Sequence, residues 1–492
     1  MLFNLPKRSF RIGMLKTYRL TISVYILPVA LALSGLNSMV NAGGLTSSLD
    51  HAMSYDPVLQ AAVYAHQINL SRIPQARAAL LPAINFTTQN NLGRGSYVFS
   101  GSEVSDRFVR SNSQTLQATQ VLYRPALQLA LEQSKLQAMQ TLALLHQAEH
   151  DLLQRLLQAY IDLQIARNQQ EVALAQVKTQ ALQLAVAQRG LVIGMKTLPE
   201  VYEAQSKLGI AQAQVIEAAA QWRVKRWELL RITGETGQEN AIELPFFADS
   251  FLVQEWAEKF STNLAVRWAE QARLDAPAVR VQMVVVDIAL REIEKNRAAH
   301  LPAVDLTVSR ARNSSSGNAS AAQNYDSSNR ANQFGIQVTV PLFAGGGIVA
   351  KVRESVGVWE KAQFDLETAQ LLAESNAVFA LESISSATAQ IQALQASVEA
   401  AQFAIETNTA GMRLGSRTPL DVLNAEQQFT IARRDWRKAR FDLIMQVVKL
   451  RASAGMLDRL DLRALDEGFQ PTLLLPSDSD NLRGQRLAIT KK

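Results

Sequence analysis

The feature that most constrains this chain is an internal repeat with a nearly constant offset. Three blocks of the first half return in the same order 220 or 221 residues later: 81–86 at 301–306, 117–123 at 337–343, and Gly194 with Thr197 at Gly415 with Thr418. Shared order and spacing indicate a tandem duplication, which has to be recognised before the fold is considered. We therefore expect two copies of one unit, at 43–240 and 255–455. A linker at 241–254 would join them, and a tail at 456–492 would follow.

Prolines and glycines mark where the elements of each copy begin and end. Pro82 and Pro302 each follow a leucine, and proline disfavours helix at the residue before it, so a helix should end there. A strand pair joined by a polar loop should follow, with the strand pairs at about 84–121 and 304–340 and the loops at 91–112 and 313–332. A long helix and a shorter returning helix complete each copy. In the first copy they should lie at about 125–190 and 198–233, and in the second copy at about 348–411 and 419–454.

The length of the continuous helices predicts a rod. A helix of roughly 66 residues is about 100 Å long. Leu145, Leu152, Leu156 and Leu163 have the 7-4-7 spacing that is typical of a coiled coil. The shorter helices each have about half that length, so two of them could lie end to end beside one long helix. We expect a long antiparallel helical rod; an ordinary spectrin-like bundle is the alternative.

Strict alternation in the strands indicates one apolar and one polar face. In 334–340 the apolar Phe334, Ile336, Val338 and Val340 alternate with Gly335, Gln337 and Thr339. This pattern fits a membrane barrel with a wet interior or a half-buried soluble sheet. In lipid, four strands cannot close a barrel and open edges are not tolerated. A membrane barrel would therefore be shared: two chains give about 8 strands and three give about 12, and a water-filled pore favours three.

The first 42 residues have the organisation of a signal peptide. Five basic residues precede an apolar run at 20–33, and Val40-Asn41-Ala42 is a small-residue cleavage pattern. A membrane anchor is the alternative, although the run is shorter than the ~20 apolar residues of a span. The formal charge of +6 falls to +1 without this segment, so nucleic acid is not an expected partner.

Catalytic patterns are weak. The chain has no cysteine, which excludes disulfides and thiol chemistry. His146-Gln147-Ala148-Glu149-His150 matches the inverted zinc-protease motif H-x-x-E-H, but it lies inside a coiled-coil helix with no evident third ligand. Gly345-Gly346-Gly347 lacks the lysine of a phosphate loop and indicates a sharp bend between strand and helix. We expect no enzyme activity, no metal site and no cofactor.

The order of elements and several motifs resemble the TolC-type outer-membrane efflux and secretion proteins. The similarity covers about 45–455 and is carried by three motifs: Ala79-Leu80-Leu81-Pro82, Val340-Pro341-Leu342-Phe343-Ala344-Gly345-Gly346, and Gly411 to Ala425. The resemblance implies an α+β membrane protein of the cell outer membrane that extends into the periplasm. It implies a homotrimer whose 12-stranded β-barrel, four strands per chain, lies in outer-membrane lipid and continues as a coiled-coil α-helical barrel. The linker and tail would form an equatorial belt.

The same resemblance implies a function and partners. The chain would be the passive exit duct of a tripartite efflux pump or a type I secretion system. It would dock with a periplasmic adaptor (membrane-fusion) protein and an inner-membrane transporter of ABC, RND or MFS type. A periplasmic adaptor, or another structural coiled-coil protein, is the alternative for the chain itself.

The resemblance also implies an iris-like gate at the turns that follow the long helices. Asp421 resembles the acidic residue that constricts the pore, Arg417 the basic residue that links the gate, and Glu200 its acidic partner. The remaining motif positions would shape the turns themselves: Gly194, Thr197, Gly415, Thr418 and Pro419. Met412 stands where the best-known member has tyrosine, and Asn424 where it has a second aspartate. A purely structural interpretation exists, because Thr197-x-x-Glu200 and Thr418-x-x-Asp421 are capping boxes.

Overall fold

The computed structural model describes residues 45–99, 102–234, 246–247, 265–320, 323–466 and 469–470. Met1–Asn41 and Ala42–Lys492 form two separate units, and every element below belongs to the second. The predicted signal peptide lies outside the described residues, as do most of the predicted linker and most of the predicted tail.

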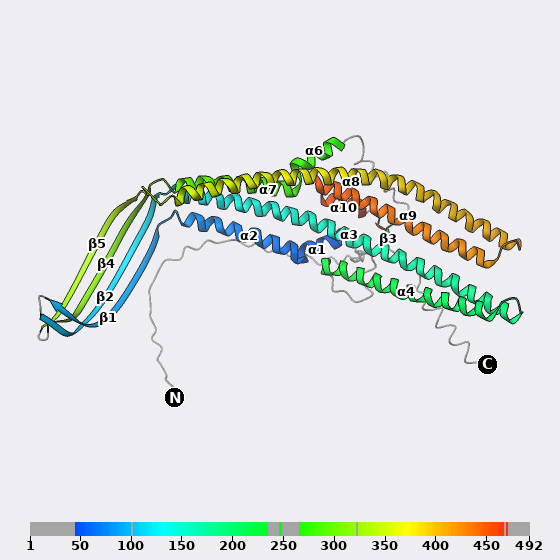
Figure 1. Cartoon of the computed structure of the whole chain (residues 1–492), viewed down its shortest axis with the longest axis horizontal. Helices are drawn as coiled ribbons and strands as arrows, with labels where there is room; N and C mark the ends of the chain where they lie inside the picture. Colours follow the sequence, from blue (N-terminus) through cyan, green and yellow to red (C-terminus); the bar gives the residue numbers. More distant parts are fainter. Residues whose placement is uncertain are drawn as a thin grey trace, which may run out of the picture. The chain divides into compact units, whose positions relative to one another are not determined.

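The second unit contains the same series of elements twice (Figure 1). The first series is α1 (Leu45–Tyr55), α2 (Pro57–Ala78), β1 (Ala83–Phe99), β2 (Ser102–Tyr123), α3 (Pro125–Val192) and α4 (Leu198–Thr233). The second is α6 (Ala265–Asp275), α7 (Pro277–Ala298), β4 (Ala303–Ser320), β5 (Gln323–Thr339), α8 (Gly347–Arg413) and α9 (Pro419–Ser453). Linker and tail meet where two short strands pair, β3 (Phe246–Phe247) and β6 (Phe469–Gln470), and α10 (Arg459–Asp466) precedes the latter.

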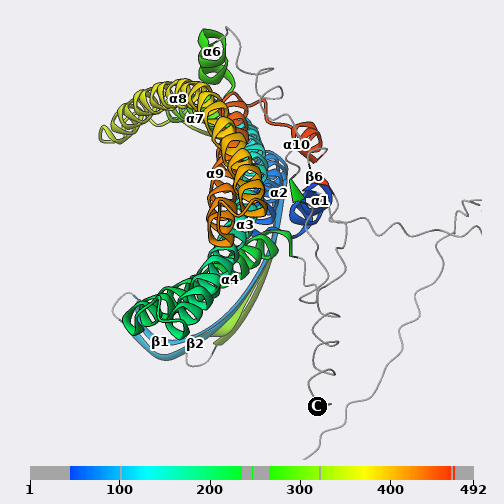
Figure 2. The same cartoon turned by 90° about the vertical axis from the view of Figure 1, so that its right-hand side faces the viewer.

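The helices form the predicted antiparallel rod. α3 has 68 residues and α8 has 67. α2 and α4 both pack against α3, and α7 and α9 both pack against α8. Figure 1 shows each pair of shorter helices end to end beside its long partner. In Figure 2, α8, α9, α3 and α4 follow one curve within this unit. None of the described helices is long and apolar enough to span a membrane.

Glycines allow the shorter helices to meet end to end. Gly234 ends α4 and Gly455 follows α9, with φ of 71° and 68°, a conformation that glycine adopts without steric cost. A Cβ at Gly234 would overlap the ring of Tyr55, and one at Gly455 would overlap the backbone of Asp275. Tyr55 is the last residue of α1, just before α2, and Asp275 is the last residue of α6, just before α7. The end of α4 therefore approaches the start of α2 as closely as the end of α9 approaches the start of α7.

The buried core lies around these joints. Leu152, Leu156 and Leu163 of α3 are almost fully buried, as are Leu443 and Val447 of α9. α8 contributes mainly small residues to this core, among them Ala373, Ala377 and Ala380. Small side chains allow helices to approach closely.

The four long strands form one antiparallel sheet in the order β1-β2-β4-β5. Ala83 lies opposite Thr119 in the first hairpin, and Ala303 lies opposite Thr339 in the second. Both members of the second pair follow those of the first by 220 residues. The sequence offset is therefore also the offset of the strand register.

The polar loops predicted at 91–112 and 313–332 are wrong. β1 continues to Phe99 and β2 begins at Ser102, while only two residues separate β4 from β5. The segments are rich in Asn, Ser and Gly, yet their backbones continue the ladder, as where Asn90 lies opposite Asn112. The Asn112 side chain also donates to Asn90 Oδ1 at 2.5 Å. Backbone pairing and cross-strand polar contacts hold these polar segments in the sheet.

The alternation predicted for the strands produces one apolar face across the whole sheet near the helices. Directly opposed residues of an antiparallel pair share a face. Ile84, Ala118, Val308 and Phe334 form one such row through all four strands. The adjacent row on the other face is polar, with Asn85, Gln117, Ser309 and Gln333. Phe334 and Ile336 are 73% and 60% exposed in the single chain.

Candidate gate turns

The turn between α8 and α9, with the start of α9, holds two of the predicted gate residues, Arg417 and Asp421, and the predicted turn residues Gly415, Thr418 and Pro419. Gly415 has φ of 74° and turns the chain after α8. Thr418 caps α9, and its backbone N–H and hydroxyl donate to Asp421 Oδ2 at 2.8 and 2.9 Å. The Asp421 N–H donates back to Thr418 Oγ1 at 3.2 Å. The predicted capping box is present, and Pro419 occupies the first position of α9, where no N–H is needed.

The turn between α3 and α4 repeats this arrangement. Gly194 has φ of 75°, and Glu200 Oε2 accepts from the backbone N–H of Thr197 at 2.7 Å and from its hydroxyl at 3.0 Å. Lys196 adds an ion pair, with its Nζ 2.6 Å from Glu200 Oε1. The same cap chemistry therefore holds both turns, and the first carries a further charge pair.

A glycine in each long helix makes room for the basic residue of the turn. A Cβ at Gly190 would lie 2.5 Å from Lys196 Cγ, and one at Gly411 would lie 2.7 Å from Arg417 Cγ. The amide of Lys196 donates to the Gly190 carbonyl at 3.1 Å, and that of Arg417 to the Gly411 carbonyl at 3.2 Å. Sequence reasoning missed this packing, although Gly190 and Gly411 are themselves related by the offset of 221.

Arg417 and Glu200, the predicted basic and acidic partners of the gate, do not meet within one chain. Glu200 is paired with Lys196, and no carboxylate among the described residues forms an ion pair with exposed Arg417. Figures 1 and 2 both show the α3–α4 turn apart from the α8–α9 turn. A charged link between the two helical hairpins runs from Lys178 to Glu426, at 3.1 Å.

Hydrogen bonding holds the carboxylates of Glu200 and Asp421 in their charged forms. The Lys196 side chain, followed by the N–H and hydroxyl of Thr197, lowers the pKa of Glu200 to about 2. The N–H and hydroxyl of Thr418 lower the pKa of Asp421, and the charge of Arg417 adds to the effect. Donors that bind the ionised form stabilise it, so both residues are negative at neutral pH.

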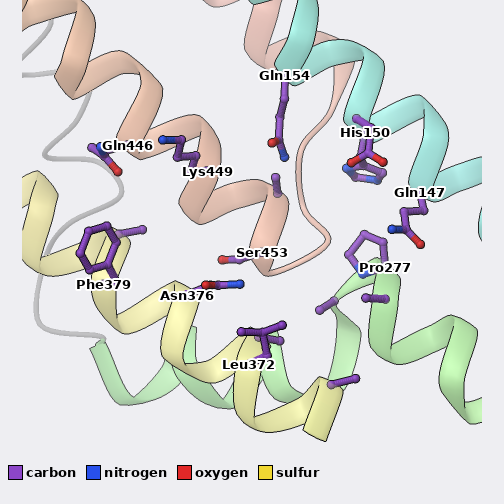
Figure 3. Close-up of a pocket in the computed structure, with 17 residues that line it drawn as sticks. Gln147, His150, Gln154, Pro277, Leu372, Asn376, Phe379, Gln446, Lys449 and Ser453 are labelled. Atoms are coloured by element: carbon purple, nitrogen blue, oxygen red, sulfur yellow. The ribbon is translucent and has the colours of Figure 1, made fainter. Parts of the chain in front are cut away.

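A cavity of ≈ 530 Å³ lies between α3, α7, α8 and α9 (Figure 3). Asp56, 2% exposed, accepts from Arg155 at 2.5 Å in the first copy. In the second copy, Ala276 corresponds to Asp56 by the offset of 220, and Asn376 corresponds to Arg155 by the offset of 221. Both residues line the cavity. The cavity therefore occupies the place where the first copy has an ion pair between the buried Asp56 and the partly exposed Arg155.

Of the two histidines and the glutamate of the H-x-x-E-H motif, only His150 lines this cavity (Figure 3). Burial lowers the pKa of His150. His146 Nδ1 lies 3.1 Å from Glu149 Oε2 in a local contact on the surface of α3. In the part of the chain that the structure describes, no three acidic or histidine side chains are grouped so as to hold a metal ion.

A sheet with one apolar face, continued by a curved wall of helices with capped turns at the far end, defines an outer-membrane channel protein. The family described as outer membrane efflux protein matches residues 49–235 and 268–456. The chain belongs to this family. It is an outer-membrane exit duct of efflux pumps or secretion systems and extends into the periplasm. This decides against the alternative of a periplasmic adaptor.

Curated relatives match over most of their length. The chain is 29% identical to the alkaline protease secretion protein AprF of Pseudomonas aeruginosa, over 87% of each chain. It is 29% identical to the proteases secretion protein PrtF of Dickeya chrysanthemi, over 90% of this chain and 95% of that one. It is 26% identical to the outer membrane protein TolC of Vibrio cholerae, over 90% and 97%.

Solved structures share the fold. The CmeC outer membrane channel of Campylobacter jejuni has a TM-score of 0.67 at 15% identity, covering 93% of this chain and 94% of that one. The outer membrane protein VceC of Vibrio cholerae has a TM-score of 0.65 at 16% identity, covering 84% and 96%. Family members are channels of tripartite pumps and secretion systems that work with adaptors and inner-membrane transporters.

Proposed function

We propose that three copies of this chain form the passive outer-membrane duct of a type I secretion system. The carrying observation is the open four-stranded sheet: its apolar face suits lipid, but its two edges need partners, since backbone groups cannot stay unpaired there. Three copies supply about 12 strands. Within one chain α8, α9, α3 and α4 follow a curve (Figure 2), and the other two copies would continue that curve around a common axis.

Polypeptide is the favoured cargo. AprF and PrtF, each 29% identical to this chain, are both named as protease secretion proteins. We infer partners to match: a periplasmic adaptor and an inner-membrane transporter of the ABC type. Small-molecule efflux with an RND or MFS transporter is the second candidate, favoured by the similarity to BepC of Brucella suis, an outer membrane efflux protein, at 24% identity.

The proposed gate is the ring of turns at the end of the helices. Around a three-fold axis, three Asp421 carboxylates would form the constriction. Arg417, whose guanidinium has no carboxylate partner among the described residues of the single chain, would tie the turns of neighbouring copies together. Glu200 is a weaker candidate for its partner, because Lys196 already binds it.

Two measurements test these proposals. Mass in mild detergent should be three times that of the mature chain, and a stable monomer in lipid would contradict the shared barrel. Crosslinking in cells, followed by purification, should recover an ABC transporter with an adaptor. Recovery of an RND or MFS transporter instead would reject the secretion assignment and support efflux.

A further inference from the structure

All three arginines of β4 and β5 lie on the apolar face of the sheet. Arg310 and Arg312 belong to β4 and Arg330 belongs to β5, and all three side chains are exposed. Successive side chains of a strand point to opposite faces, so these positions share the face of Val308 and Phe334. The other face of β4 and β5 carries no basic residue.

Two of these arginines lie directly opposite each other. Arg312 is paired with Arg330 in the register of β4 and β5. Like charges at directly opposed positions destabilise a sheet. No ion pair joins either of them to a carboxylate among the described residues. Two positive charges without a partner carboxylate are therefore held side by side on a face that is apolar toward the helices.

The chain offers these charges no nearby counter-ion. On their face of β4 and β5 the only acidic residue is Asp326, four positions from Arg330 and so about 13 Å away along the strand. Asp305 lies on the other face, opposite Gln337. β1, an edge strand of the sheet, has no acidic residue. A contact between sheet edges of two copies would therefore bring no carboxylate of β1 to Arg330.

The arginines lie at the end of the apolar face that is farther from the helices. Arg330 precedes the apolar Val338 of the same face by eight residues, which is about 26 Å along the strand. The apolar band of an outer-membrane barrel is about 25 Å tall, and a charge in it costs least near the headgroups. Because the helices extend into the periplasm, this end of the sheet faces the outer leaflet (Figure 1).

We propose that Arg310, Arg312 and Arg330 bind the phosphate groups of lipopolysaccharide, the phosphorylated glycolipid of the outer leaflet. The inference rests on the proposed shared barrel, whose apolar face would be the outer one. Guanidinium groups bind phosphate through paired N–H donors and are more weakly hydrated than ammonium groups. A phosphate between Arg312 and Arg330 would neutralise the two charges that the sheet holds together.

The neighbouring rows of the same face favour a glycolipid over a free anion. On the helix side, Val308 and Phe334 are 44% and 73% exposed and would contact acyl chains. On the side of the hairpin tips, the next row has only amides and hydroxyls, from Asn90, Asn112, Ser314 and Ser328. These groups can hydrogen-bond to sugars. The order of rows matches the order of acyl chains, phosphates and sugars in the lipid.

Binding can be measured as the rise in melting temperature of lipid-stripped protein in an uncharged detergent during titration with purified lipopolysaccharide. We expect Arg312→Gln with Arg330→Gln to weaken the apparent affinity about tenfold or more, since the phosphates lose charge-assisted hydrogen bonds. Without lipid, the same variant should melt no lower than the wild type, because the repulsion between the opposed charges is gone. A merely structural role for the arginines would not produce this dependence on lipid.

Two further variants control for charge and for assembly. Arg223→Gln with Arg231→Gln removes the same charge from exposed positions of α4, which lies away from the sheet (Figure 1), and should bind as the wild type does. Arg312→Lys with Arg330→Lys keeps the charge but loses the planar fork, so its affinity should be intermediate. If the glutamine variant does not assemble, the lysine variant carries the comparison with the wild type.

Two further probes identify the ligand. Lipopolysaccharide whose phosphates have been removed enzymatically should bind the wild type about as weakly as intact lipopolysaccharide binds the glutamine variant. Inorganic phosphate at the same concentration should leave the melting temperature unchanged. An equal rise with inorganic phosphate would reduce the surface to a simple anion site and reject the lipid. Undiminished binding of the dephosphorylated lipid would reject the role of phosphate.

The outcomes separate this inference from the proposed duct. Equal affinity of the wild type and the glutamine variant for lipopolysaccharide would overturn the inference. A detergent mass of three chains and an unchanged conductance would then leave the duct in place. A changed ion selectivity of the glutamine variant in planar bilayers would show that the arginines line the pore. That result, or a monomeric wild type, would reject the proposed barrel and the inference with it.

Discussion

Gly411 and Arg417 are in direct backbone and side-chain contact across the end of α8. The Arg417 N–H donates to the Gly411 carbonyl at 3.2 Å, and a Cβ at Gly411 would lie 2.7 Å from Arg417 Cγ. The first carbon atoms of the arginine stem therefore lie where any other residue would place its side chain. The direction of the guanidinium thus depends on a glycine inside the preceding helix.

Gly411→Ala should displace Arg417 and loosen the closed turn, so we expect a higher resting conductance in planar bilayers. Gly357→Ala is the matched control, because Gly357 lies in the same helix and a Cβ added there would meet nothing within 4 Å. Both changes gain helix propensity of up to about 1 kcal/mol. Equal conductance in the two variants would show that the contact does not position the gate.

Arg417→Ser should raise resting conductance, because it removes the cation proposed to hold neighbouring turns together. Lys196→Ser should raise it less, since Lys196 is bound to Glu200 inside its own turn. Single-channel recording under identical salt compares the two. A larger effect of Lys196→Ser would show that the turn between α3 and α4, and not the turn that holds Arg417, links neighbouring copies.

Asp421→Ala should weaken cation selectivity and block by trivalent cations, by roughly an order of magnitude for block, because acidic rings select cations. Asn424→Ala is the control, because Asn424 lies about one helical turn after Asp421 and its side chain carries no charge. Both are measured as reversal potential and block in planar bilayers. Unchanged block in Asp421→Ala would place the acidic constriction elsewhere.

The sequence predicts the elements well because the prolines and glycines that end them occur twice, at equivalent positions of the two copies. Pro82 with Pro302, and Gly194 with Gly415, mark the same boundaries twice, so each position supports the other. The hairpin tips differ from expectation because a polar composition does not by itself indicate a loop. Asn90 opposite Asn112 shows that backbone pairing continues without an apolar face.

The contacts that position the turns are harder to foresee. The contact of Gly411 with Arg417 depends on the left-handed residue Gly415 between them, which folds the chain back onto the helix. The cavity at Ala276 and Asn376 depends on which helix ends meet. Its counterpart, the Asp56–Arg155 pair, is separated by 99 residues in sequence, and nothing in the local pattern joins those two positions.

The faces of the barrel strands can be tested with neighbouring residues. Ile336→Arg places a charge on the apolar face and should impair insertion, at a cost of ~2–4 kcal/mol at mid-bilayer. Gln337→Arg lies on the polar face and should insert but alter conductance. Outer-membrane fractionation and bilayer recording give the two readouts. Inverted behaviour would mean that the apolar face lines the pore.

The turn between α3 and α4 should keep its cap in acid. The pKa of Glu200 is about 2, below the ordinary value of 4.5, chiefly because Lys196 donates to it. A lowered pKa means that the carboxylate contributes its stabilisation above pH 4.5 and loses it as the pH falls through about 2. Hydrogen exchange at the start of α4, corrected for intrinsic rates, should therefore show protection at about pH 3.5.

Lys196→Met removes the largest cause of this shift, so the protection should then be lost at a higher pH than in the wild type. Glu200→Gln should lower protection at about pH 7 and about pH 3.5 alike, because the wild-type carboxylate is charged at both. An identical pH profile for Lys196→Met and the wild type would show that the Thr197 donors alone hold the charge. The ion pair of the first turn would then add nothing to its cap.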